Sequence, residues 1–186
     1  MRVISGIARG LKLNSPVNDD VRPTTDRVKE SMFNIIASRI YDSSVLDLFS
    51  GSGALGIECI SRGSKYVYFC DNNENSIKVI KSNLEKARFY DNYEIMKDDF
   101  RNIIKILSNK NEKFDIIFVD PPYYEGLFDE VISMIINKKI LEDDGLIVVE
   151  HDSNIIMKEY DGIYKIKEKK YGMTKLTFYS LEENYE

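Results

Sequence analysis

The feature that most constrains the fold is the junction between an apolar run and a glycine-rich turn within residues 45–56. The apolar part is nearly continuous rather than alternating, which is typical of a strand covered on both faces in a parallel sheet. Gly51 and Gly53 allow a sharp turn and a close approach of the backbone to a ligand. The helix expected from Ala54 directs its free N–H groups to the same place. The segment therefore predicts a strand, a ligand-binding loop and a helix.

An acidic residue inside this strand narrows the choice of ligand. The glycines within 51–56 fit the dinucleotide pattern G-x-G-x-x-G, which is a weak signal when it stands alone. Asp47 would repel a pyrophosphate, whereas it suits the ammonium group of S-adenosylmethionine (SAM). Asp71 ends the next apolar run, at about the 20-residue offset typical of a carboxylate that binds ribose hydroxyls. SAM is therefore the predicted cofactor, and a nicotinamide dinucleotide is the lesser alternative.

Further candidate cofactor ligands lie beside these turns. After the third expected strand, Asp99 is placed to accept the adenine amino group of SAM and Phe100 to line the adenine ring. A solvated helix cap explains Asp99 equally well. The full set of predicted cofactor-binding residues is Thr24, Asp47, Phe49, Ser50, Gly51, Gly53, Asp71, Asn72, Asp99 and Phe100.

A second stretch with chemical character is Asp120-Pro121-Pro122-Tyr123, which follows an apolar strand. Ligands of open α/β folds bind at the carboxyl ends of such strands. Two consecutive prolines remove two N–H donors and hold the backbone rigidly, so the turn offers only carbonyl acceptors. Asp120 adds a carboxylate and Tyr123 an aromatic face. The matching ligand has an NH2 group to donate and a flat ring to stack, as a nucleobase with an exocyclic amine does.

The chemistry predicted for this motif is methyl transfer to that amine. Hydrogen bonds to Asp120 and the Pro121 carbonyl would favour a pyramidal nitrogen with its lone pair aimed at the methyl group of SAM. Tyr123 would hold the extruded base by stacking. We expect a structural role for the single histidine, His151, because nothing nearby completes a catalytic pair. The predicted catalytic residues are Asp120, Pro121, Pro122 and Tyr123.

Composition limits the class of protein. The 186 residues suit one domain of ordinary size. Cys59 and Cys70 do not form a C-x-x-C pair, and with one histidine they leave no zinc set, so no metal is predicted. The N-terminus lacks the apolar core of a signal peptide, and no apolar run approaches the roughly 18 residues of a membrane span. We expect a soluble, cytoplasmic monomer without a membrane partner.

Charge is distributed unevenly along the chain. The net charge of −5 argues by itself against a nucleic-acid partner, but residues 1–40 carry +3 and the remainder −8. A basic arm on an acidic body is compatible with a locally docked polyanion, and also with a merely solvated surface. The candidate RNA contacts in this arm are Arg2, Arg9, Lys12, Arg22 and Arg27.

The order of expected elements predicts an α/β fold. Residues 2–13 suggest a β-hairpin or an extended arm, and apolar residues from Val28 to Ile40 recur at helical spacing. Strands are then expected at 45–49, 66–70, 93–96, 114–119 and 145–150, and helices at 54–61, 74–87, 100–108 and 126–137. Such alternation is typical of right-handed crossovers and a mainly parallel sheet. Residues 163–170 and 173–181 predict an antiparallel hairpin at the sheet edge, where the lysines of 165–170 protect the edge from aggregation.

Three motifs together resemble one family over nearly the whole chain. They are Arg22-Pro-Thr-Thr-Asp-Arg-Val-Lys-Glu30, Leu46-Asp-Leu-Phe-Ser-Gly-Ser-Gly-Ala-Leu-Gly-Ile-Glu58 and Asp120-Pro-Pro-Tyr123. The chain resembles the RsmD-like guanine-N2 methyltransferases of small-subunit ribosomal RNA. The resemblance implies a Rossmann-like, seven-stranded SAM-dependent methyltransferase sheet at residues 41–186, preceded by an arm and helix at residues 1–40 that dock RNA and cover the cofactor. It implies methyl transfer to N2 of a guanine in 16S-type RNA, within a ribosomal subunit or an assembly intermediate.

Two other functions stay open at this point. The D-P-P-[YF] motif also occurs in DNA adenine-N6 methyltransferases, but those normally carry a target-recognition insertion for which the short connections leave no room. A non-catalytic RNA-binding or ribosome assembly protein is the second alternative, and it would have no need of Asp47, Gly51, Gly53 and Asp120. The arm also departs from the family pattern G-[RK]-x-L, since Leu11 stands in the basic position.

Overall fold

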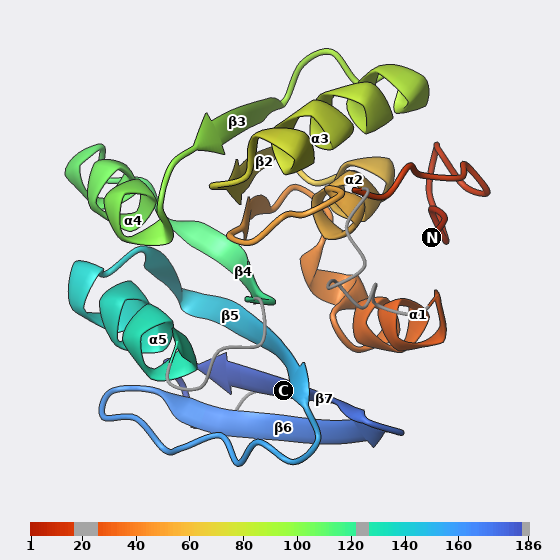
Figure 1. Ribbon diagram of the computed structural model, residues 1–186. Helices are drawn as coiled ribbons and strands as arrows, with labels where there is room; N and C mark the ends of the chain where they lie inside the picture. The colour runs from red at the N-terminus through yellow and green to blue at the C-terminus, as the bar shows by residue number, and fades with distance from the viewer. Residues whose placement is uncertain (17–25, 122–126, 184–186) are drawn as a thin grey trace.

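A single mixed sheet forms the centre of the molecule in the computed structural model, which describes residues 1–16, 26–121 and 127–183. The strand order in the described part of the chain is β3-β2-β1-β4-β5-β7-β6 (Figure 1). The strands are β1 (Ser44–Asp47), β2 (Tyr66–Asp71), β3 (Tyr93–Lys97), β4 (Phe114–Val119), β5 (Leu141–Asp152), β6 (Tyr164–Tyr171) and β7 (Thr174–Ser180). Strands β1 to β5 pair in parallel, and β7 pairs antiparallel with both β5 and β6. The predicted fold class, including the antiparallel hairpin, is confirmed.

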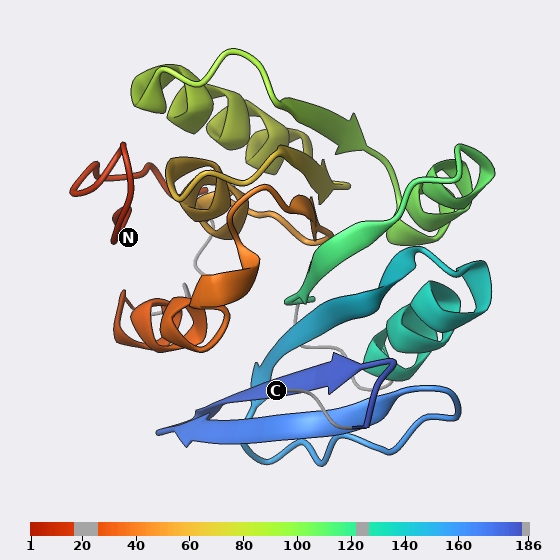
Figure 2. The ribbon, with the colours of Figure 1, turned by 180° about the vertical axis from the view of Figure 1, so that it is seen from behind.

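Helices cover both faces of the sheet, and each face has its own apolar core (Figures 1 and 2). The described helices are α1 (Asp26–Ile35), α2 (Ala54–Ser61), α3 (Glu74–Ala87), α4 (Phe100–Asn109) and α5 (Leu127–Lys138), with a short 3-10 helix at Ala37–Arg39. Side chains of α1, α2 and α3 pack on one face, and those of α4 and α5 pack on the other. The central strands β1, β2 and β4 are largely buried and nearly continuously apolar, as expected of strands covered on both faces.

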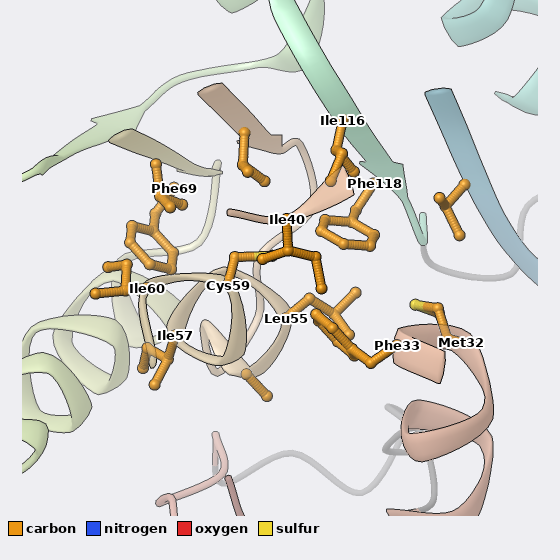
Figure 3. Close-up of a cluster of buried hydrophobic side chains, with 14 of the residues drawn as sticks. Met32, Phe33, Ile40, Leu55, Ile57, Cys59, Ile60, Phe69, Ile116 and Phe118 are labelled. Atoms are coloured by element: carbon orange, nitrogen blue, oxygen red, sulfur yellow. The ribbon is translucent and has the colours of Figure 1, made fainter. Parts of the chain in front are cut away.

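The N-terminal helix is part of the main core. Phe33 of α1 lies against Phe118 of β4, with ring centroids 5.9 Å apart (Figure 3). Val3 and Leu13 of the arm belong to the same cluster as Phe33. The arm and α1 are therefore packed against the sheet domain, and a functional boundary near residue 40 stays a prediction.

Three local expectations differ in detail from the structure. Residues 2–13, expected to form a β-hairpin or an extended arm, form a tight arm with one isolated antiparallel bridge, between Arg2 and Lys12, and no regular strands. Its turns use Gly6 and Gly10, both at positive φ, which interrupts strand geometry. The helix expected to reach Ile40 ends at Ile35, and a 3-10 turn carries the chain on.

Strand β5 begins at Leu141, not at residue 145 as expected. The β4–β5 register shifts in this region, where Phe114 pairs with Leu141 but Ile116 pairs with Leu146. The residues between Leu141 and Gly145 are polar, so the apolar pattern did not predict the start of the strand. Gly145 fits the irregular backbone because a Cβ there would lie 2.7 Å from the Leu141 side chain.

Candidate active site

The sheet topology brings the two predicted chemical stretches to one edge. Asp47 pairs with Phe69 on one side and with Phe118 on the other, so the ends of β1, β2 and β4 lie side by side. Val119 of β4 pairs with Val149 of β5, which places Asp120 and Glu150 at the next position of neighbouring strands. The glycine loop and the start of the Asp-Pro-Pro motif therefore leave the sheet at the same edge.

The loop after β1 has the backbone geometry that its glycines predicted. Gly51 and Gly53 have φ values of +54° and +77°, and Gly53 precedes the first residue of α2. Space remains beside Gly51, where a Cβ would meet no atom within 4 Å. Ser50 fastens the loop to β2, because its hydroxyl donates to the Asp47 carbonyl over 2.7 Å and accepts the Cys70 N–H over 2.9 Å. The loop is thus held in place, with Gly51 partly accessible and Gly53 buried.

Asp47 lies beneath this loop and is 2% exposed. Its Oδ2 accepts the N–H of Gly56, in the first turns of α2, over 3.1 Å. Burial raises the pKa of the Asp47 carboxyl to about 7, with Asp71 adding to the rise and the Gly56 bond opposing it. Gly56 has no room for a side chain, since a Cβ would lie 2.3 Å from the ring of Phe69. The predicted contact of Asp47 with the cofactor ammonium group stays a prediction.

Asp71 connects the end of β2 to the glycine loop. Its Oδ2 accepts the N–H of Gly51 over 2.9 Å, and its Oδ1 accepts the N–H of Asn73 over 2.8 Å. The neighbouring residue Asn72 is exposed. The sequence placed Asp71 beside the ribose of the cofactor, and the structure gives it this additional role in shaping the loop.

An aromatic pair stands beside the loop. The rings of Phe49 and Phe100 have centroids 5.6 Å apart, and Phe100 is 6% exposed. Asp99 is the N-cap of α4, where its Oδ1 accepts the Arg101 N–H over 2.9 Å, and it also forms an ion pair with Arg101 at 3.1 Å. The helix cap considered for Asp99 is therefore present, and its contact with adenine stays a prediction. The two rings provide an apolar wall suited to a flat heterocycle.

Asp120 directly follows the last residue of β4 and is half-buried. Burial and the nearby carboxylates of Glu150 and Asp47 raise the pKa of Asp120 well above its ordinary value. Pro121 is buried directly after it. Four predicted site residues lie outside the described part of the chain: Arg22, Thr24, Pro122 and Tyr123.

Sequence reasoning gave no role to Glu150, although it stood at the end of an expected strand. The sheet register places it beside Asp120. Its neighbour His151 is 3% exposed, and its Nε2 lies 2.8 Å from Thr177 Oγ1 while its Nδ1 lies 2.9 Å from the Asp152 carbonyl. Burial lowers the pKa of His151. These contacts suit the structural role expected of the histidine.

The four described residues among the predicted RNA contacts are exposed: Arg2, Arg9, Lys12 and Arg27. Arg2 and Lys12 face each other in the arm, and Arg2 also forms an ion pair with Asp26 at 3.2 Å. Arg27 lies in the first turn of α1, beside Asp26. Within the described residues no helix is long and apolar enough to cross a membrane, and no group of three or more metal-binding side chains is present.

Comparison with known proteins identifies the family. The family model described as "Conserved hypothetical protein 95" matches residues 1–180. The chain belongs to this family. The "Ribosomal RNA small subunit methyltransferase D" of Escherichia coli (strain K12) is 36% identical over 152 residues, which is 82% of this chain and 75% of that protein. The YlbH protein of Bacillus subtilis (strain 168) is 37% identical over 180 residues, which is 96% of this chain and 98% of that protein.

A solved structure has the same fold. This structure, of the yhhF protein from Escherichia coli, is 31% identical, has a TM-score of 0.84, and covers 99% of both chains. The family predicted from the three sequence motifs is confirmed.

Proposed function

We propose that this protein transfers a methyl group from SAM to the exocyclic N2 amine of a guanine in small-subunit ribosomal RNA. The main support for this proposal is that Asp120 and Pro121 follow β4 at the same edge of the sheet as the glycine loop. The predicted enzyme class, a SAM-dependent RNA methyltransferase, is confirmed by the family and its relatives.

The residues of the sheet edge fit the cofactor. The space beside Gly51 suits a ligand that lies against backbone, and Phe49 with Phe100 suits the adenine ring. Asp71 suits the ribose hydroxyls, and the buried carboxylate of Asp47 suits the ammonium group. When bound, SAM supplies an activated methyl group. The chain supplies the position and the electrostatic environment of the amine that receives it.

Asp120 would bind the amine and accept the proton that the amine must lose. An amine that gains a methyl group becomes cationic and must lose one proton. A carboxylate that accepts a hydrogen bond from the amine stabilises that charge, and the Pro121 carbonyl offers a second acceptor. The raised pKa of Asp120 also makes this carboxyl group a better proton acceptor than an ordinary aspartate.

Glu150 favours guanine over adenine as the base. Guanine presents the N1–H donor beside its N2 amine, whereas adenine presents an N1 acceptor beside its N6 amine. When both carboxyl groups are ionised, they match two neighbouring donors and would repel the adenine N1 lone pair. Asp120 and Glu150 therefore support the guanine-N2 enzyme over the DNA adenine-N6 methyltransferase.

The exposed cations of the arm would contact the RNA backbone. Arg2, Arg9 and Lys12 lie on the arm and Arg27 lies at the start of α1. Phosphate contacts of this kind position a nucleic acid without reading its sequence. We place the enzyme in the cytoplasm as a monomer, acting on RNA within a ribosomal subunit or an assembly intermediate.

Transfer of labelled methyl from SAM to small ribosomal subunits that lack the modification tests the proposal. Nucleoside analysis should recover N2-methylguanosine as the labelled product, and subunits that already carry the modification should accept no label. Label in N6-methyladenine of DNA would favour the adenine enzyme. Binding of subunits with no transfer would favour the assembly protein.

A further inference from the structure

Two backbone carbonyls on either side of Gly53, one in the glycine loop and one at the start of α2, accept hydrogen bonds from side chains of other helices. The Ser52 carbonyl accepts a hydrogen bond from Asn83 Nδ2 over 2.9 Å. The Ala54 carbonyl accepts one from Lys29 Nζ over 3.4 Å. Asn83 comes from α3 and Lys29 from α1, and both residues are fully buried. The two carbonyls flank Gly53, so the turn that meets the cofactor is held on each side.

The same two side chains also hold the N-terminal arm. Asn83 Oδ1 accepts the N–H of Asn14 over 2.8 Å, and Asn83 Nδ2 donates to the Asn14 carbonyl over 3.0 Å. Lys29 Nζ donates to the Arg2 carbonyl over 2.8 Å. A single side chain therefore connects each end of the arm to the backbone beside Gly53.

Glu58 of α2 completes the link at the start of the arm. Its Oε2 lies 3.0 Å from Lys29 Nζ and accepts the N–H of Ile4 over 2.7 Å, while its Oε1 accepts the N–H of Ser5 over 2.9 Å. Both side chains of this ion pair are fully buried. A buried ion pair is retained only when further hydrogen bonds satisfy it, and here the arm backbone provides them.

We propose that Asn83 and Lys29 are positioning residues that link the arm to the cofactor loop, so that RNA docking on the arm and SAM binding strengthen each other. The RNA part rests on the proposed function. Both arm contacts are made by backbone groups, which leaves the cationic side chains of Arg2, Arg9 and Lys12 exposed for phosphate. An arm fixed by RNA would hold the carbonyls of Ser52 and Ala54 in place. Thermodynamic linkage then requires SAM to strengthen RNA binding by the same factor.

The test measures SAM affinity by calorimetry, with and without unmodified small subunits, for the wild type and two variants. Asn83→Ala removes the link to Ser52. Ser82→Ala is the matched control, because Ser82 is the exposed neighbour on α3 whose Oγ accepts from Asn14 Nδ2 over 3.2 Å without reaching the loop. Asn83→Ala should weaken SAM binding about tenfold without RNA and lower the factor by which subunits strengthen it. Ser82→Ala should leave both quantities within about twofold.

A second variant covers the case in which Asn83→Ala does not fold. Asn83→Ser keeps a small neutral hydroxyl in this buried position, but it is too short to make all three hydrogen bonds of Asn83, so it should weaken SAM binding as well. A folded Asn83 variant with wild-type SAM affinity would overturn the positioning role, and an unchanged strengthening factor would overturn the coupling. Failure of the wild type to methylate ribosomal RNA would refute the proposed function instead, while the SAM measurements without RNA still decide the role of Asn83.

Discussion

The N–H of Gly51 donates to Oδ2 of Asp71 over 2.9 Å, which joins the turn after β1 to the end of β2. The residue expected to bind the ribose of the cofactor therefore also shapes the loop that we propose as the cofactor site. Removal of the Asp71 side chain beyond Cβ would abolish both effects together.

Asp71→Ala should weaken SAM binding by about tenfold to a hundredfold, because the variant lacks both a charge-assisted hydrogen bond and an anchor of the loop. Asp71→Asn keeps an acceptor for the Gly51 N–H and should lose less affinity. Calorimetry on the two variants gives the comparison. Equal SAM affinities for Asp71→Ala and the wild type would contradict the assignment of Asp71 to the cofactor site.

Asp47→Asn should stabilise the protein while weakening its binding of SAM. Burial raises the pKa of Asp47 from an ordinary 3.8 to about 7, so the folded state keeps a proton that the unfolded state releases. Protonation of Asp47 therefore contributes its whole stabilisation at pH values below the pKa in the unfolded state. This contribution is lost as the pH rises through the folded-state pKa of about 7. At pH 8 the neutral amide avoids the buried charge.

We expect Asn at position 47 to raise the free energy of unfolding at pH 8 by roughly 1 to 4 kcal/mol, since one pKa unit corresponds to about 1.4 kcal/mol. Urea denaturation at pH 4 and pH 8 checks the sign, because the gain should shrink at the lower pH. A variant that is less stable than the wild type at pH 8 would contradict the role of burial. Unchanged SAM affinity would contradict the contact with the ammonium group.

Asp120→Ala should abolish methyl transfer and leave SAM affinity within a few-fold, because we propose that the carboxylate binds the base and not the cofactor. In the wild type, kcat/KM should rise with pH as Asp120 loses its proton. The midpoint should lie well above that of an ordinary aspartate, since burial and the carboxylates of Glu150 and Asp47 raise its pKa. Loss of SAM affinity together with activity would move Asp120 into the cofactor site.

Glu150→Gln should lower kcat/KM for RNA about tenfold if its carboxylate accepts the guanine N1–H. Substrates with guanine or 2-aminopurine at the mapped target separate the contacts, since 2-aminopurine keeps the N2 amine and lacks the N1–H. The preference of the wild type for guanine should shrink in the variant. Glu142→Gln is the control, because Glu142 lies half-buried at the opposite end of the same strand. An equal preference for guanine over 2-aminopurine in the wild type, Glu150→Gln and Glu142→Gln would exclude Glu150 from base selection.

Replacing Arg9 and Lys12 with Ala should flatten the salt dependence of subunit binding, by a slope of about 0.7 to 0.9 for each phosphate that the arm no longer neutralises. kcat/KM should fall and SAM affinity should hold, since these side chains are exposed on the arm. The control replaces two exposed lysines on the helices of the other face, Lys105 and Lys138. A double arm variant with the wild-type salt slope and activity would show that RNA docks elsewhere.

The sequence predicted what local patterns encode. The apolar run before Gly51 predicted β1, the run before Asp120 predicted β4, and strict alternation predicted the parallel sheet. It did not predict the links between distant residues. Lys29 and Glu58 each stand in an apolar helix pattern as ordinary polar residues, and nothing within either helix indicates that they meet in the core.

Asn83 was missed for the same reason. Its three hydrogen bonds go to Asn14 and Ser52, which lie far from it in the sequence, so its burial leaves no periodic signal.

Asp99 shows the opposite case. A cap is a local interaction, so the sequence suggested it directly, and the structure contains it.

The anchors of the arm also set an order of folding. The arm is synthesised first, but Ile4 binds Glu58, 54 residues later, and Asn14 binds Asn83, 69 residues later. Contacts between such distant residues form slowly, because a long loop must close before they contribute. A nascent chain therefore carries an arm without its full set of anchors until both α2 and α3 have formed. The amide protons of Ile4 and Asn14 should accordingly be among the last to gain protection from hydrogen exchange when the protein folds.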